Sequence, residues 1–156
     1  MSNEKTLYER LGGYGAITAV ANDLLPRLQA DPQLGRFWAH RGEDGFKREK
    51  QLLIDFLCAS AGGPMYYRGR DMVLTHRGMR ISEGDWNVFL GHAAATLAKF
   101  KVPEAEQRDV VAFVQSLKKE IVELRRFPTS QESRRRRLTR SWCGRRTSSD
   151  NVDIST

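Results

Sequence analysis

Residues 62–76 read GGPMYYRGRDMVLTH, and this irregular stretch lies between two long amphipathic patterns. Its opening Gly62-Gly63-Pro64 is a strong stop signal for a helix, because glycine favours leaving a helix and proline lacks a backbone N–H. Gly69 follows, and only a brief helical stretch is expected at residues 71–76, ending on His76. The stretch therefore predicts a loose connection between helices that carries one histidine.

Helices are predicted on the N-terminal side of this stretch, at residues 14–30 and 46–61, since apolar side chains recur there every three or four positions. Pro26 lies inside the first and is expected to kink it, because the ring removes one backbone donor. Residues 31–38 are expected to form a further short helix, with an Asp cap followed by Pro. Residues 41–45 are expected to form a loop.

Two more helices are predicted on the C-terminal side. Ser82 resembles a helix cap, and an apolar stripe continues from there to Leu97. Pro103 suits the start of the last helix, whose stripe runs to Leu124. The chain shows no alternating strand pattern, so the predicted fold class is all-α.

The last thirty residues differ in composition from the rest. Residues 127–156 hold seven Arg against three acidic residues, so they carry +4 of the net charge of +7, and they hold few large apolar residues. Such a segment buries too little apolar surface to offset the entropy lost on ordering. We therefore expect a folded domain at residues 1–126 and a basic, Ser/Arg-rich disordered tail at residues 127–156.

Cysteine usage and hydropathy point to a cytoplasmic protein. Cys58 and Cys143 lie far apart, which does not suit the disulfide framework of a small secreted protein. The first ten residues are polar and contain no apolar signal core. No stretch approaches the ~18 apolar residues that span a bilayer, so no membrane partner is expected.

Motifs alone do not indicate an enzyme. The three histidines, His40, His76 and His92, form no cluster with cysteines or with each other, so a zinc site is unsupported. No phosphate-binding loop, Ser–His–Asp arrangement or nucleophile elbow is visible. A lone histidine is more often a surface or core residue than a ligand.

Large apolar residues from several separate helices allow two interpretations. They are Phe37, Trp38, Phe56, Met72, Trp86 and Phe89. Most such sets are simply core. The functional alternative is a slot for a flat aromatic cofactor beside a segment with one histidine, which is how haem iron is held. Periodicity does not choose between the two.

The body of the chain resembles the truncated haemoglobins, most closely their first group, over residues 6–123. The residues that carry the resemblance are Leu7-Tyr8-Glu9-Arg10-Leu11-Gly12-Gly13, Ala30-Asp31-Pro32-Gln33-Leu34, Phe37-Trp38, Asp55-Phe56-Leu57, Gly62-Gly63-Pro64, Tyr67-x-Gly69-x-x-Met72-x-x-x-His76, and Ile81 with Trp86. Two glycine pairs, a further glycine and the following histidine, in this order and spacing, make the signal specific.

The resemblance implies a shortened globin in which two helices pack over two others around one haem b per chain. His76 matches the proximal iron ligand of the family, whereas His40 and His92 do not. The resemblance assigns haem contacts to Trp38, Leu53, Phe56, Leu57, Met72, Thr75, Ile81 and Trp86.

The distal pocket departs from the family pattern. The first group often has Tyr on the second helix and Gln on the distal helix, where this chain has Leu25 and Leu53, neither of which donates a hydrogen bond. Glu49 falls where another distal polar residue sits. Tight oxygen binding is therefore not expected unless Trp38, Tyr66 or Glu49 supplies the missing polar contact.

The leading functional hypothesis is a haem protein that reversibly binds a diatomic gas at an iron held by His76. The gas would be oxygen, nitric oxide or carbon monoxide, oxygen transport would be one role, and an unidentified reductase would be a partner. A second hypothesis is a haem-dependent nitric-oxide dioxygenase or weak peroxidase, and gas binding is favoured over an enzymatic role. A third is a haem-free helical module that binds nucleic acid or protein through Arg134–Arg137, because consecutive arginines bind phosphates.

Overall fold

The computed structural model describes residues 4–123. All regular structure in this range is helical, which confirms the all-α prediction. The elements in chain order are α1 (Leu7–Arg10), α2 (Gly13–Ala30), the 3-10 helix η1 (Gly35–Trp38), α3 (Glu43–Ser60), α4 (Met72–His76), α5 (Glu83–Lys99), α6 (Glu104–Ser116) and α7 (Lys118–Ile121).

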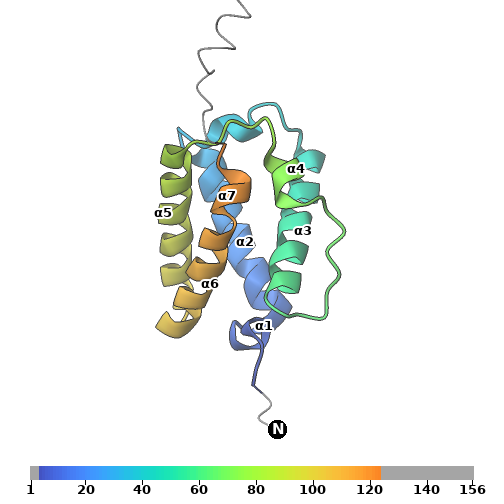
Figure 1. Cartoon of the computed structure of the whole chain (residues 1–156), viewed down its shortest axis with the longest axis vertical. Helices are drawn as coiled ribbons and strands as arrows, with labels where there is room; N and C mark the ends of the chain where they lie inside the picture. The colour runs from blue at the N-terminus through green and yellow to red at the C-terminus, as the bar shows by residue number, and fades with distance from the viewer. Residues whose placement is uncertain (1–3, 124–156) are drawn as a thin grey trace, which may run out of the picture. The chain divides into compact units, whose positions relative to one another are not determined.

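The longer helices form two packed pairs, as expected for two helices over two. Helix α2 packs on both α3 and α5, and Figure 1 shows α2 running behind α6 with α3 on one side and α5 on the other. Leu24, Leu25 and Leu28 of α2 are buried against side chains of η1, α3 and α5. Trp86 of α5 is buried against Val114 of α6. The apolar stripes of the sequence therefore meet in the centre of the bundle.

Helix α5 begins at the predicted cap. The Ser82 hydroxyl accepts a hydrogen bond from the Asp85 backbone N–H at 3.2 Å, and the Asp85 carboxylate accepts one from the Ser82 N–H at 2.8 Å. This reciprocal capping box satisfies two backbone donors that a helix start leaves open.

Three predicted boundaries are corrected. Residues 41–45 are not all loop, because α3 already begins at Glu43, where two acidic side chains suit the positive end of the helix dipole. The short segment before it is a 3-10 helix at Gly35–Trp38. The last helix is interrupted at Leu117, whose N–H bonds the Val114 carbonyl three residues back at 3.1 Å and so tightens the final turn of α6.

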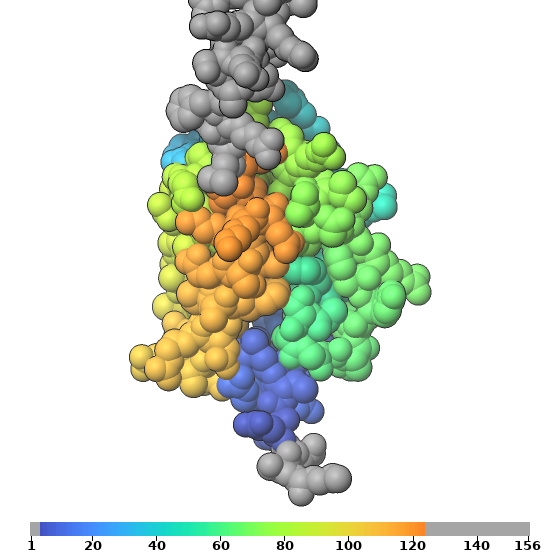
Figure 2. Space-filling view, in the orientation of Figure 1, coloured from blue at the N-terminus to red at the C-terminus, as the bar shows by residue number. Residues whose placement is uncertain are grey.

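The end of the described chain is tied to the segment that follows α4. The Glu123 N–H donates to the Ile81 carbonyl at 2.9 Å, and the Glu123 carboxylate accepts from the Gly78 N–H. Figure 2 shows the surface of α6 and α7 meeting the surface of the segment around α4. The histidine-bearing segment is thus held at its C-terminal side.

The predicted boundary between residues 126 and 127, and the tail beyond it, lie outside the described residues. Among residues 4–123, none of the helices combines the length and the hydrophobicity needed to cross a bilayer.

Candidate functional site

His76 ends α4, and its ring is held by the backbone of its own helix. The Asp71 carboxylate caps the helix by accepting from the Leu74 N–H at 2.8 Å. His76 lies one helical turn after Met72, and its Nδ1 is 2.9 Å from the Met72 carbonyl oxygen. Because a carbonyl only accepts, Nδ1 carries the proton, and the neutral ring then presents the lone pair of Nε2. This is the orientation that metal-binding histidines adopt.

Helix α4 is poorly covered by the other described residues. None of its five residues is buried, and Val73 and Leu74 are half exposed. An isolated helix of this length is unstable in water, so its position depends on contacts with other groups. Contacts with α7 hold one side of α4 in place. The uncovered apolar side chains leave room for a group that is not part of the polypeptide.

Tyr67 links the segment before α4 to α3. Its ring meets Phe56 edge-on, with centroids 5.2 Å apart, and its hydroxyl donates to the Arg70 carbonyl at 2.8 Å. Burial raises the pKa of Tyr67, which keeps this donor protonated. A side chain at Gly69 would overlap the Tyr67 phenol, so the close approach of ring and backbone explains the glycine. Tyr67 is among the residues that carry the family resemblance, but the sequence does not predict this packing.

Two of the residues predicted for the distal side, Leu25 and Leu53, lie in one apolar cluster. Leu25 is only 4% exposed, and Leu53, Trp38 and Phe46 pack against the cluster to which it belongs. Phe56, one turn beyond Leu53, contacts Tyr67 and also lies 5.9 Å from the ring of Phe113. The side chain of α2 in this cluster is thus apolar at position 25 and cannot donate a hydrogen bond.

Two polar atoms stand out in this apolar region. Trp38 Nε1 and Glu49 Oε2 have no access to solvent and no hydrogen-bond partner among the described residues. Glu49 Oε2 lies 3.4 Å from an Arg41 guanidinium nitrogen, which is a loose ion pair and not a hydrogen bond. Buried polar groups without a partner are rare in folded proteins and call for an explanation.

The remaining predicted contacts lie in neighbouring clusters. Ile81 and Trp86 are buried together with Val122, and the indole N–H of Trp86 donates to Gln115 at 3.4 Å. Leu57 packs against the cluster of Ile17, Ala21, Ile54 and Cys58. These predicted residues thus belong to three clusters: Trp38, Leu25 and Leu53 share one, Ile81 and Trp86 share another, and Leu57 packs on the third.

The other two histidines are placed differently from His76. His92 Nε2 is 2.8 Å from the Asp31 carboxylate, and this hydrogen bond is the main cause that holds the pKa of Asp31 below its ordinary value. His40 is exposed. Within residues 4–123, no three His, Cys, Asp or Glu side chains gather as metal ligands.

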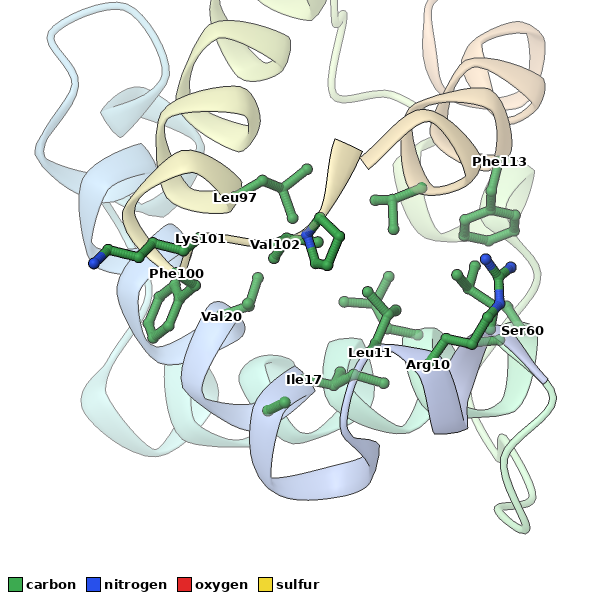
Figure 3. Close-up of a pocket in the computed structure, with 16 residues that line it drawn as sticks. Arg10, Leu11, Ile17, Val20, Ser60, Leu97, Phe100, Lys101, Val102 and Phe113 are labelled. Carbon is green, nitrogen blue, oxygen red and sulfur yellow. The ribbon is translucent and has the colours of Figure 1, made fainter. Parts of the chain in front are cut away.

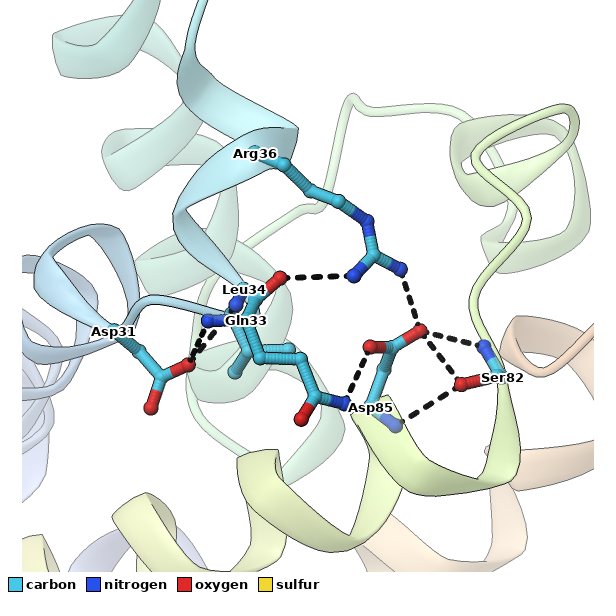
Figure 4. A network of polar contacts seen from close by, with 6 residues as sticks. All are labelled: Asp31, Gln33, Leu34, Arg36, Ser82 and Asp85. Carbon is cyan, nitrogen blue, oxygen red and sulfur yellow. Dashed lines mark hydrogen bonds and ion pairs between the residues drawn. The ribbon is translucent and has the colours of Figure 1, made fainter.

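Asp85 forms a buried polar network that the sequence did not reveal (Figure 4). Its side chain is 1% exposed, and it accepts hydrogen bonds from Gln33 at 2.8 Å and Arg36 at 2.7 Å as well as from Ser82. Burial alone raises the pKa of Asp85, but these hydrogen bonds outweigh it and hold the pKa well below its ordinary value. The network fastens the segment before η1, and so Trp38, to the start of α5.

An apolar cavity of about 270 Å³ lies at the other end of the bundle, near α1 (Figure 3). Its apolar lining includes Ile17, Val20, Leu97 and Phe113. Leu57 is the one predicted haem contact that borders it. The cavity is therefore a separate space beside the predicted site.

Comparison with protein families gives one match over most of the chain. The family model described as bacterial-like globin matches residues 6–123. A group 1 truncated haemoglobin from Tetrahymena pyriformis is 26% identical over 122 residues, which cover 78% of this chain and 98% of the relative. Another, from Nostoc commune, is 32% identical over 93 residues, which cover 60% of this chain and 76% of the relative.

Solved structures agree with this match. The truncated haemoglobin of Tetrahymena pyriformis in its Fe(III) form superposes with a TM-score of 0.70 at 26% identity, covering 77% of this chain and 100% of that one. A haemoglobin from Chloroflexus aurantiacus gives a TM-score of 0.67 at 25% identity, covering 78% and 100%.

Proposed function

The chain belongs to the bacterial-like globins and, among them, to the group 1 truncated haemoglobins, and on this basis we propose that it reversibly binds a diatomic gas at a haem iron held by His76. Haem is the cofactor of this family, with one haem b per chain as the normal arrangement. Oxygen is the gas we propose first, with nitric oxide and carbon monoxide as further ligands.

The residues present fit a haem. Within residues 4–123, none of the side chains of α4 is buried, although α4 carries the histidine. The indole nitrogen of Trp38 is buried and has no hydrogen-bond partner among the described residues. The group that would lie between them is large, flat and apolar, with polar atoms at its rim and at its centre. A haem between α3 and α4 accounts for both observations.

The observation that carries the proposal is the hydrogen bond between His76 Nδ1 and the Met72 carbonyl at 2.9 Å. It fixes the ring tautomer and stops the ring from turning, so that Nε2 is held in one direction as a ligand. Hydrogen bonding of the far nitrogen also makes the coordinating nitrogen more basic. The chain thus supplies one oriented nitrogen ligand, which is the number that a globin contributes.

When bound, haem supplies an iron atom that coordinates the gas. Buried leucines, chiefly Leu25, would make part of the ligand side apolar, and His76 would hold the iron from the other side. The mostly apolar cavity beside Leu57 has room for a small neutral gas.

Absorption spectroscopy of the full chain loaded with haem tests the ligand assignment. His76→Gly is expected to lose the ferrous, ligand-free spectrum of the wild type, and added imidazole should restore it by taking the place of the missing ring. His92→Ala is the matched control and should keep the wild-type spectrum, since His92 contacts Asp31. A wild-type ferrous spectrum in His76→Gly without imidazole contradicts the assignment.

A weak peroxidase is a second candidate, and Glu49 is the observation that favours it. A carboxylate on the ligand side of the haem is suited to accept and return a proton during such a reaction. Peroxide-dependent oxidation of an aromatic electron donor should then fall strongly in Glu49→Gln. Equal rates in the two proteins argue against this candidate.

A further inference from the structure

Trp38 and Glu49, on the side of the predicted haem opposite His76, each have one buried polar atom without a hydrogen bond among the described residues. Trp38 Nε1 is a donor and Glu49 Oε2 is an acceptor, and both are buried without hydrogen bonds among the described residues. Thr18 Oγ1 shares this status, but a helical threonine hydroxyl can turn towards the carbonyl four residues back. An indole nitrogen has no such freedom, so Trp38 needs an acceptor from outside the described residues.

Trp38 and Glu49 border the same space. Phe46 and Leu53, which precede and follow Glu49 by three and four residues on α3, both pack against the cluster that Trp38 contacts. Arg41 joins the two directly, because its N–H donates to the Trp38 carbonyl at 3.0 Å and its guanidinium lies 3.4 Å from Glu49. Both residues therefore lie beside the same apolar cluster, on the side of α3 that carries Leu53.

The other candidates for a distal donor are excluded by the structure. Tyr66 is 87% exposed and does not reach into the core. Leu25 and Leu53 have no polar atoms. Trp38 is the remaining residue on this side with a buried donor, so the chain holds a donor although the usual Tyr and Gln are missing.

We propose that Trp38 and Glu49 face the ligand of the haem iron as donor and acceptor, and that together they favour a neutral protic ligand, of the class of water and hydrogen peroxide. An indole N–H only donates and a carboxylate only accepts. A protic molecule satisfies both at once, whereas an anion or a gas satisfies the indole and leaves the carboxylate facing an electron-rich atom. This inference rests on the proposed function, because it requires haem between α3 and α4.

Fluoride, an anion that only accepts hydrogen bonds, separates the two roles. It is titrated into the full-length, haem-loaded ferric protein at one pH. Trp38→Phe is expected to weaken fluoride binding about tenfold, the worth of a hydrogen bond to a charged acceptor. Glu49→Gln is expected to tighten it by a similar factor, because an amide replaces the repelling carboxylate with a donor. Tyr66→Phe, the matched control, should change nothing.

Resonance Raman spectra without added ligand test the protic ligand itself. The wild-type ferric iron is expected to be six-coordinate, with water bound between Trp38 and Glu49. The double variant Trp38→Phe/Glu49→Leu should be mainly five-coordinate, since neither hydrogen bond remains. This readout reports coordination and does not depend on catalytic activity.

Three results would overturn the inference. Unchanged fluoride affinity in Trp38→Phe means that the indole donates elsewhere, for example to the carboxylates at the haem edge. Unchanged or weaker binding in Glu49→Gln means that the carboxylate does not face the ligand. A six-coordinate double variant removes the case for a protic ligand. Failure to bind haem at all would instead refute the proposed function, so the two failures are distinguishable.

Discussion

Replacing Asp85 with alanine should destabilise the fold more than any surface change in the same helix. The carboxylate is 1% exposed and accepts hydrogen bonds from Gln33, Arg36 and Ser82. Loss of the reciprocal cap with Ser82 costs about 1 kcal/mol. Loss of the buried bond from Gln33 to a charged acceptor costs about 2 kcal/mol. Arg36 is half exposed and regains water, so its pair adds less than about 1 kcal/mol. The free energy of unfolding should therefore fall by about 3–4 kcal/mol, in the range for breaking a buried pair.

The assay is urea unfolding of the full-length, haem-loaded protein, followed by far-ultraviolet circular dichroism at a fixed haem concentration, because cofactor binding itself adds stability. Glu83→Ala is the matched control. Glu83 also lies in the first turn of α5, but its pair with Lys118 is exposed, so the cost should stay below about 1 kcal/mol. A cost below about 1 kcal/mol for Asp85→Ala would refute the role given to the network.

The stability that the Asp85 carboxylate contributes should depend on pH. The pKa of Asp85 is depressed in the folded protein from an ordinary value of 3.8, so the unfolded chain binds the proton more readily. Stability from this group is therefore present above the ordinary pKa and is lost as pH falls through it towards the folded value. The difference between the wild type and Asp85→Asn should be constant from pH 7 to pH 5 and should shrink below pH 4. A difference that persists unchanged at pH 3 contradicts the assignment.

Two further changes test the packing and the domain boundary. Gly63→Ala places a Cβ 2.6 Å from Tyr8 Cδ2 and 2.9 Å from the Cys58 carbonyl oxygen, so calorimetry should show a lower melting temperature, with a loss of about 1–3 kcal/mol. In Gly91→Ala in α5 the added Cβ meets nothing within 4 Å. This change should raise the melting temperature, with a gain of about 0.5–1 kcal/mol in the free energy of unfolding. Melting temperatures that shift in the same direction in the two variants would contradict this packing. A chain ending at Arg126 should keep the haem absorption of the full chain. Any binding of the full chain to anionic polymers should weaken steeply with salt, and salt-insensitive binding by the shortened form would rule out the tail as its cause.

The fold could be predicted largely because its signals are local. The stop at Gly62-Gly63-Pro64 and the cap at Ser82 act over three or four residues, and the structure places helix ends close to both. The interruption at Leu117 was missed, because the apolar stripe continues through it and only the backbone turn changes.

The candidate site was less accessible to sequence reasoning, because it depends on side chains that meet from distant positions. The brief helix before His76 is confirmed, and its role as a ligand stays a prediction. The contact of Tyr67 with Phe56 and the approach of Gln33 and Arg36 to Asp85 join residues from separate elements. Nothing in the local pattern around Asp85 distinguishes a buried clamp from an ordinary helix cap.

The unpaired atoms of Trp38 and Glu49 needed the structure most of all. A tryptophan near a helix end is usually core, and a glutamate on an amphipathic helix is usually solvated. Only the burial of Nε1 and Oε2 without a hydrogen-bond partner among the described residues separates them from such residues.

The central claim is that His76 Nε2 is the one protein ligand to the iron, and the iron–histidine stretching band in the low-frequency resonance Raman spectrum tests it most directly. The full-length protein is measured in its ferrous, ligand-free form with ordinary and with ¹⁵N-labelled histidine. The account predicts a band that shifts to lower frequency on labelling, is lost in His76→Gly and is unchanged in His92→Ala. A labelled band that survives in His76→Gly would contradict it.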